Sequence, residues 1–263
     1  MAPRPPEIRT VNVTRYVTPL REGGSLPAIV EADDDFLYVM KFRGAGQGKK
    51  ALVAELIGGE LARALGLKVP ELVFMNLDVS FSTAEPDEEI QDLLKFSTGL
   101  NLGLHYLSGA ITYDPLVSVA DALTASKVVL LDSLITNVDR TWRNTNMLNW
   151  NKELWLIDHG ASLYFHHTWE KWPEYAQKPF PAIKDHVLMI RATMLEEAKE
   201  EIKRLITKET LRGIVDVVPD EWLEEDGYSP QDRKEVYVAF LTTKLSNIDR
   251  LTREAADVRK TGF

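Results

Sequence analysis

The sequence contains no cysteine among its 263 residues. Disulfide bonds, thiolate-bound zinc and cysteine nucleophiles are therefore excluded. The composition is otherwise that of an ordinary globular protein, because 44% of the residues are hydrophobic and 27% are charged. A chain of this length can bury a sizeable core, either as one large domain or as two lobes that share a cleft.

The sequence also has fewer basic than acidic residues. The chain has 31 Lys and Arg against 40 Asp and Glu, which gives a formal net charge of −9. Proteins that act mainly on nucleic acid usually have a basic surface, so a nucleic-acid partner is not expected. A local basic pocket for nucleotide phosphates is compatible with this total, because net charge does not report how the charges are distributed.

Long hydrophobic runs and targeting segments are absent as well. No run approaches the roughly 18 apolar residues of a membrane span, so no membrane partner is expected. The proline-rich beginning, Met1 to Pro6, lacks the apolar centre of a signal peptide. We therefore expect a cytoplasmic protein.

Several catalytic motifs are missing. Neither Gly-x-Ser-x-Gly nor His-Glu-x-x-His occurs, so no motif in the sequence supports a hydrolase function.

Two glycine clusters are candidates for binding phosphate, because glycine lets backbone N–H groups approach an anion closely. They are Gly23-Gly24-Ser25 and the group Gly44, Gly46 and Gly48 with Lys49 and Lys50. The second cluster lacks the Gly-Lys-Ser/Thr ending of a P-loop, which argues against a Walker-type NTPase.

The pattern of apolar residues changes along the chain. The first part alternates as strands do and predicts a small antiparallel sheet followed by a helix. Strands are predicted over residues 8–18, 27–30, 36–42 and 72–77, and a helix over residues 50–65. A polar stretch over residues 82–92 indicates a surface insertion. The later part predicts two short strands, 146–149 and 154–157, and helices over residues 117–136, 182–205, 208–217 and 230–258. The fold class is therefore α+β, with a β-rich part preceding a mostly helical part.

The segment from Asn137 to Gly160 carries the strongest chemical signal. Asn144 follows Asp139 after five positions, and Asp158 closes an apolar strand 19 positions after Asp139. Phosphoryl transfer uses this combination: one carboxylate orients the attacking hydroxyl, while an amide and a second carboxylate hold Mg²⁺. Asn146 is an alternative to Asn144 as the amide ligand. Asp and Asn also favour turns, but the order and spacing together favour chemistry.

Lys41 supports the same interpretation from the first part of the chain. It lies on the predicted strand Tyr38–Phe42 among apolar neighbours, where a lysine can contact nucleotide phosphates. The following helix offers Glu55 and Glu60 as partners that could hold Lys41 in place. The ordinary alternative is that Lys41 is exposed on a half-buried strand and that Glu55 and Glu60 lie on a solvated helix face.

Together these residues resemble the HipA-like kinase family, in particular its stand-alone bacterial kinase domains. The matching features, in order, are Lys41, Glu55, the loop Asn137-x-Asp139-Arg140 with Asn144, and Ile157-Asp158-His159-Gly160. The resemblance implies a two-lobe protein-kinase-like fold, with a small β-rich N-lobe containing one helix (residues 1–110) and a larger helical C-lobe (residues 111–263). It further implies ATP as donor, Mg²⁺ as cofactor, and phosphorylation of Ser/Thr hydroxyls, including autophosphorylation.

The resemblance also implies a role for each site residue. Asp139, Lys41 and Glu55 would be catalytic, and Asp158 with Asn144 or Asn146 would bind the metal. The nucleotide would contact Gly23, Gly24, Ser25, Lys41 and the adenine hinge His105, Tyr106 and Leu107. Two departures are Thr141, where many relatives have histidine, and His159, which replaces the Phe of Asp-Phe-Gly. Neither departure removes a required carboxylate.

The acceptor stays open at this level. A protein Ser/Thr kinase, a small-molecule phosphotransferase resembling antibiotic or lipid kinases, and a nucleotide-binding module without turnover all fit the residues. The partners expected are thus ATP and an unidentified protein or small-molecule hydroxyl.

Overall fold

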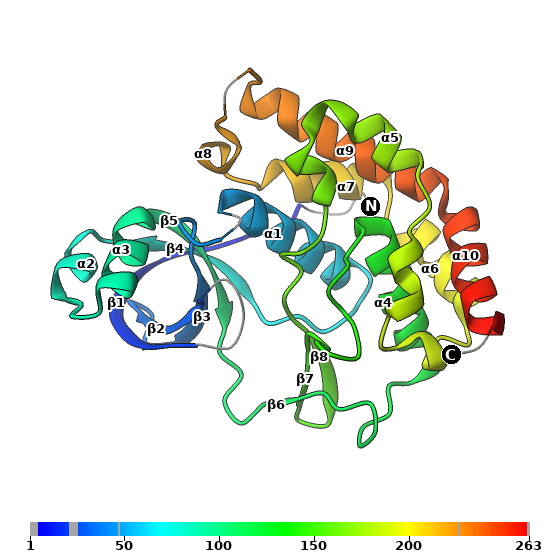
Figure 1. Ribbon diagram of the computed structural model, residues 1–263, viewed down its shortest axis with the longest axis horizontal. Coiled ribbons are helices and arrows are strands. Elements are labelled where there is room, and N and C mark those ends of the chain that lie inside the picture. Colours follow the sequence, from blue (N-terminus) through cyan, green and yellow to red (C-terminus); the bar gives the residue numbers. More distant parts are fainter. Residues whose placement is uncertain (1–4, 21–25, 47, 226, 262–263) are drawn as a thin grey trace.

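A computed structural model describes residues 5–20, 26–46, 48–225 and 227–261. The candidate phosphate loop Gly23-Gly24-Ser25 lies outside the described residues. A strand-rich part stands at one side of the molecule and a larger helical body at the other, with helix α1 (Lys49–Ala64) between them (Figure 1). The lobe boundary at residue 110 stays a prediction.

The strand-rich part is a five-stranded closed barrel in the order β1-β2-β3-β5-β4. Its strands are β1 (Thr10–Pro19), β2 (Ala28–Ala32), β3 (Leu37–Lys41), β4 (Leu72–Leu77) and β5 (Gly99–His105). Four of these strands are confirmed at the predicted places, and β5 was not predicted. The antiparallel pairing expected for the first three strands is confirmed, and β4 pairs with β1 in parallel and so closes the barrel.

Two unpredicted helices close one end of the barrel, so the expectation of a single helix in this part of the chain is wrong. They are α2 (Ser80–Ala84) and α3 (Glu88–Phe96). The stretch 82–92 is therefore helical and is not merely a polar insertion. The Asp87 side chain accepts hydrogen bonds from the backbone N–H groups of Glu89 and Ile90 and starts α3. Ile90 and Leu94, one helical turn apart, then pack into the barrel core.

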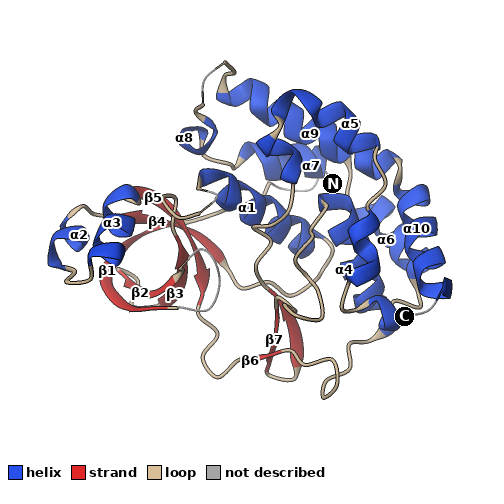
Figure 2. Ribbon diagram, in the orientation of Figure 1, coloured by secondary structure: helices blue, strands red, loops and turns tan. Residues whose placement is uncertain are grey.

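The helical body contains seven helices that are placed by the described residues, together with a small sheet. The helices are α4 (Ala122–Ile135), α5 (Trp172–Gln177), α6 (Leu195–Leu205), α7 (Lys208–Asp216), α8 (Asp220–Leu223), α9 (Pro230–Ser246) and α10 (Ile248–Thr261). The sheet consists of β6 (Ile111–Thr112), β7 (Met147–Trp150) and β8 (Glu153–Leu156). Figure 2 shows the strands gathered in the barrel and in this sheet, with helices making up most of the rest.

Three predicted helices differ from the structure. The helix predicted over 117–136 begins only at Ala122, because Asp121 caps it by accepting from the N–H of Thr124. Of the stretch 182–205, only α6 is α-helical, and two 3₁₀ turns, Pro181–Asp185 and Met189–Arg191, precede it. The stretch 230–258 divides into α9 and α10 at Asn247.

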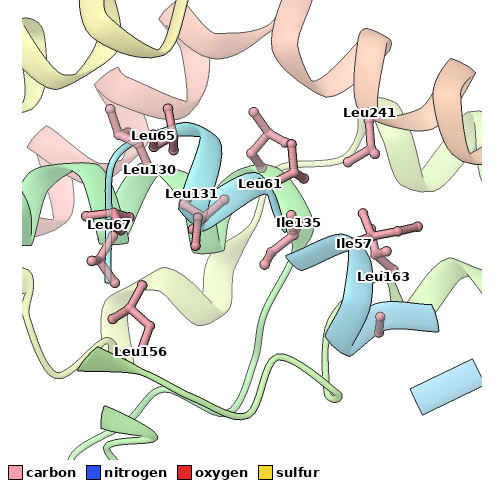
Figure 3. Packing of buried hydrophobic residues seen from close by; sticks show 14 of the residues in the cluster. Ile57, Leu61, Leu65, Leu67, Leu130, Leu131, Ile135, Leu156, Leu163 and Leu241 are labelled. Atoms are coloured by element: carbon pink, nitrogen blue, oxygen red, sulfur yellow. The ribbon is translucent and has the colours of Figure 1, made fainter. Parts of the chain in front are cut away.

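Helix α1 packs into the core of the helical body, and its contacts explain how the two parts are joined. Its buried residues belong to the same hydrophobic cluster as those of α4 and α9. Figure 3 shows Ile57, Leu61 and Leu65 of α1 facing this cluster, with Leu130, Leu131 and Ile135 of α4 nearby. Leu102 and Leu104, on the outer face of β5, belong to the cluster as well. The outside of the barrel is thus fixed to the helical core through α1.

Within the described residues, every helix is too short or too polar to cross a lipid bilayer.

A substitution in α4 tests this packing. Leu130 is 0% exposed in the shared core, so Leu130→Ala should lower the free energy of unfolding by about 2–5 kcal/mol. Leu116 is 87% exposed, and Leu116→Ala should change the free energy of unfolding by less than about 0.5 kcal/mol. Urea unfolding measures both values, and equal losses for the two variants would contradict the described core.

Candidate active site

Lys41 lies at the point where three distant segments meet. Alternation along β3 turns Tyr38 and Met40 into the barrel core and Lys41 to the opposite face. The Lys41 Nζ atom lies 2.6 Å from Glu55 Oε2 on α1 and 2.6 Å from Asp158 Oδ1, which follows β8. The expected lysine–glutamate partnership is present, and it involves Glu55 and not Glu60, which pairs with Arg63.

The charges of this cluster are mutually stabilised. Burial alone lowers the pKa of Lys41, but the carboxylates of Glu55 and Asp158 outweigh it and raise the pKa above its usual value. Burial alone raises the pKa of Glu55, yet the Lys41 ammonium and hydrogen bonding at His159 bring it below its usual range. Lys41 is therefore a cation and Glu55 an anion at neutral pH.

Glu55 also fixes the backbone that carries Asp158. Its side chain is fully buried, and Oε2 accepts the backbone N–H of His159 at 2.8 Å. His159 is buried against Gly58 of α1, where a Cβ atom would lie 2.7 Å from the His159 Cβ. Only glycine allows this close approach of the two segments.

The Asp158 carboxylate is held in place and is also accessible to solvent. One oxygen of its carboxylate is held by Lys41, while the side chain is 45% exposed. Its φ of 58° lies in the left-handed region, as does the 48° of Asn146. Non-glycine residues adopt this conformation at a cost, and such strain is frequent at functional sites.

The Asp139 carboxylate lies between the two asparagines. Its Oδ2 accepts from Nδ2 of Asn144 at 2.8 Å and from Nδ2 of Asn146 at 3.1 Å. Because both amide nitrogens donate to Asp139, each Asn carbonyl oxygen is left to act as a ligand. Asn144 is exposed and Asn146 is buried, and the choice of amide ligand between them stays a prediction.

The segment predicted to contact adenine continues from β5. The ring of His105 faces the barrel-side residue Tyr38, with ring centroids 5.7 Å apart, and so lies on the face opposite Lys41. The Tyr106 N–H donates to the carbonyl of Leu37 at 2.8 Å, and Leu107 is buried. A nucleotide on the Lys41 face would meet the backbone of this segment and not the His105 ring.

The second glycine cluster leads into α1. Gly48 has a φ of 63° and precedes the first helical residue. The Lys49 ammonium donates to the carbonyl of Glu221 at 2.6 Å, and that of Lys50 lies 3.2 Å from Glu225. A cleft of about 670 Å³ opens beside these lysines, against Tyr164, His167 and Trp222. In this structure both ammonium groups are thus engaged by the segment around α8.

Sequence reasoning missed a buried polar group behind the loop that carries Asp139. Asp132 of α4 is fully buried and pairs with Arg140, whose Nε lies 2.7 Å from Asp132 Oδ2, and with His186 at 2.9 Å. Arg140 stands in the sequence motif next to Asp139, which is a signal of its importance. Asp132 is a carboxylate in an otherwise apolar stretch, and that contrast could have pointed to it.

The chain is similar to known proteins in sequence and in fold. A sequence model of the family described as "HipA-like kinase" matches residues 13–252. The Helicobacter pylori proinflammatory kinase CtkA is similar in structure, with a TM-score of 0.55 and 13% identity over 97% of this chain and 100% of that one. The Golgi casein kinase has a TM-score of 0.50 and 12% identity over 97% of this chain and 72% of that one. No curated protein matches the chain. The two structures show a kinase fold, which confirms the predicted fold class in outline.

The buried Glu55 carboxylate predicts a pH-dependent stability. At neutral pH, Glu55→Gln should cost about 3 kcal/mol, because Lys41 loses a buried partner. The pKa of Glu55 is depressed in the folded state, so its contribution is complete above the unfolded pKa of about 4.3 and is lost as the pH falls toward the folded pKa. Urea unfolding should show the gap between wild type and variant narrowing in acid. A constant gap would contradict the ion pair.

The contact between Gly58 and His159 predicts a second effect. Gly58→Ala should lower the free energy of unfolding by about 1–3 kcal/mol, because the new methyl group collides with His159. Gly213 of α7 is the matched control, since a Cβ atom added there would lie 3.4 Å from its nearest neighbour. Gly213→Ala should be neutral or stabilising by up to about 1 kcal/mol, and thermal unfolding compares the two.

Proposed function

The chain belongs to the HipA-like kinase family, and from this premise we propose that it transfers the γ-phosphoryl group of ATP, with Mg²⁺, to a hydroxyl acceptor. The observation that carries the proposal is the contact of Lys41 with both Glu55 and Asp158. This contact joins the phosphate-binding lysine to the metal carboxylate on a shared face. Asp139 with its two asparagines completes the set of groups that phosphoryl transfer requires.

On the donor side, Lys41 would contact the phosphates of ATP. Its ammonium group is kept charged by Glu55 and Asp158 and is 13% exposed. Glu55 holds the ammonium from the buried side. The lysine therefore needs little reorganisation when an anion approaches, which favours electrostatic stabilisation of the transferring group.

The donor atoms suit Mg²⁺. Asp158 offers a partly exposed carboxylate, and Asn144 and Asn146 offer amide oxygens, since their nitrogens are used by Asp139. Mg²⁺ prefers hard oxygen ligands and takes only a few from protein when phosphates supply others. Bound there, Mg²⁺ would neutralise charge on the phosphate oxygens.

On the acceptor side, Asp139 would orient the attacking hydroxyl and receive its proton. The hydroxyl oxygen forms a bond to the γ-phosphorus, the bond from that phosphorus to the bridging oxygen breaks, and ADP leaves. The two asparagine amides hold Asp139 Oδ2, so the other oxygen is the one available to the proton. We propose Ser/Thr hydroxyls of proteins, including this chain, as acceptors.

Asp139→Asn tests the proposed function. The variant should lose about 10²–10⁴-fold in the rate of transfer, because the amide cannot accept the hydroxyl proton. Its affinity for ATP with Mg²⁺ should stay close to that of wild type, since Lys41 and Asp158 are unchanged. Incubation with radiolabelled ATP, with and without a mixture of protein acceptors, measures transfer, and calorimetry measures binding.

The matched control is Asp257→Asn, which makes the same change at an exposed position of α10. It should leave both rate and affinity unchanged. Absence of ATP binding at millimolar nucleotide with Mg²⁺ would refute the proposal outright. Binding without transfer to any protein would instead leave a small-molecule phosphotransferase or a binding module.

A further inference from the structure

Asp132 lies at the centre of a hydrogen-bond network behind the catalytic loop. It is fully buried on α4, whose other buried residues are Ala, Ser, Val, Leu and Ile. Its Oδ1 accepts from Asn137 Nδ2 at 3.1 Å, and its Oδ2 accepts from Arg140 Nε at 2.7 Å. His186 is the third donor: its Nδ1 accepts the N–H of Leu188, so the proton is on Nε2, which donates to Asp132 Oδ2 at 2.9 Å.

The first branch of the network leads to Asp139. Asn137 is buried, and while its Nδ2 donates to Asp132, its Oδ1 accepts the backbone N–H of Asp139 at 3.1 Å. The backbone N–H of Asn137 also donates to the carbonyl of Asp132 at 2.8 Å. The turn that presents Asp139 is therefore tied at two points to the most buried part of α4.

The second branch leads to the candidate metal ligands. The Arg140 guanidinium donates from Nη1 to the carbonyls of Asn146 and Ile157, the latter at 3.4 Å. Ile157 immediately precedes Asp158, and its own N–H donates to the Asn146 carbonyl at 3.1 Å. Arg140 thus holds the two backbone positions, Asn146 and Asp158, that have left-handed φ values. Strained conformations persist where surrounding contacts enforce them.

Two short paths therefore connect the Asp132 carboxylate with the proposed base, Asp139, and with the candidate metal ligands Asn146 and Asp158. We propose that Asp132 is a positioning residue for phosphoryl transfer, and that through Asn137 and Arg140 it holds Asp139, Asn146 and Asp158 in register. This inference rests on the proposed function. Asp132 itself is buried and acts only through its neighbours.

Physical arguments favour positioning over stability as the role of this network. A buried ion pair must repay the cost of removing both charges from water, and apolar residues of similar volume often give equal or greater stability. Catalysis, in contrast, is sensitive to small displacements, and about 1 Å can cost roughly 10²-fold in rate. Burial alone raises the pKa of Asp132, but Arg140 and His186 hold it below its usual value, so the carboxylate remains charged.

Asp132→Asn is the central experiment. It should lower kcat by about 10–100-fold, as changes to supporting hydrogen bonds typically do, and should change the KM for ATP less than kcat, because the contact between Lys41 and Glu55 is not part of the network. Hydrogen exchange of the 137–146 backbone should become faster than in wild type. Leu130→Ala, in the same helix, is the control: it should lower Tm while leaving kcat per folded molecule and loop exchange unchanged.

Two further variants cover the case in which Asp132→Asn does not fold. Asn137→Ala leaves the Asp132–Arg140 pair intact and cuts only the branch to Asp139, so it should lower kcat with a smaller loss of Tm. Asp132→Leu combined with Arg140→Met removes both charges together and should recover Tm while kcat stays low. Recovery of kcat along with Tm in the double variant would overturn the inference.

The outcomes separate this inference from the proposed function. If wild type transfers no phosphate, the proposed function fails, and loop exchange in Asp132→Asn and Asn137→Ala alone decides whether Asp132 orders the loop. If wild type is active but these two variants match Leu130→Ala in both kcat and loop exchange, the positioning role is refuted while the function stands.

Discussion

The contact of Lys41 with Glu55 and Asp158 is the interaction on which the site depends. It joins the barrel, helix α1 and the segment after β8. In the sequence, Glu55 lies 14 positions and Asp158 lies 117 positions after Lys41. Lys41 and Glu55 are largely buried, and neither charge would be stable there alone. Each carboxylate keeps the lysine charged, and the lysine keeps Glu55 ionised. The fold thereby places a cation and an accessible carboxylate side by side, and the proposed binding of nucleotide and Mg²⁺ rests on this arrangement.

Helix α1 makes this contact possible because it belongs to the helical core. Its apolar residues pack with α4 and α9, while Glu55 reaches from the same helix to Lys41 on the barrel. The close approach of Gly58 to His159 brings the segment after β8 against the helix. Displacing α1 would therefore separate the lysine from its partners, and the geometry of the site is coupled to the packing between the barrel and the helical body.

Behind the candidate site, the loop that carries Asp139 is held from α4. Asp132 lies next to leucines that anchor the helix in the core, and its hydrogen bonds to Asn137 and Arg140 transmit that rigidity outward. The polar network and the apolar core are thus continuous: the core fixes α4, α4 fixes Asp132, and Asp132 constrains the loop that carries Asp139. Enzyme sites held by such supporting bonds need little rearrangement during reaction.

Local patterns were enough to place many elements of the fold. Alternation located β1 to β4, and the pair of short strands at β7 and β8 was confirmed within a residue or so. The segment Ser80–Phe96 was misjudged, because its polar residues dominate the pattern, although Ile90 and Leu94 are buried in the barrel core and Phe81 and Leu93 pack against it. β5 was missed although Leu100, Leu102 and Leu104 alternate along it, because Gly99 and Gly103 are residues that strands disfavour. The break at Asn247 has no strong local signal, since helical periodicity continues across it.

By itself, the sequence named the residues of the proposed site: Lys41, Glu55, Asp139, the two asparagines and Asp158. It also identified the HipA-like kinase family, to which the chain belongs. Order and spacing report residue types along one dimension, and that is sufficient for a motif. Only the tertiary structure decided that Glu55 rather than Glu60 meets Lys41, that β1 pairs with β4 to close the barrel, and that Asp132 supports the loop. These depend on contacts between residues far apart in the chain, whose energies come from burial and charge in three dimensions and leave little trace in local periodicity.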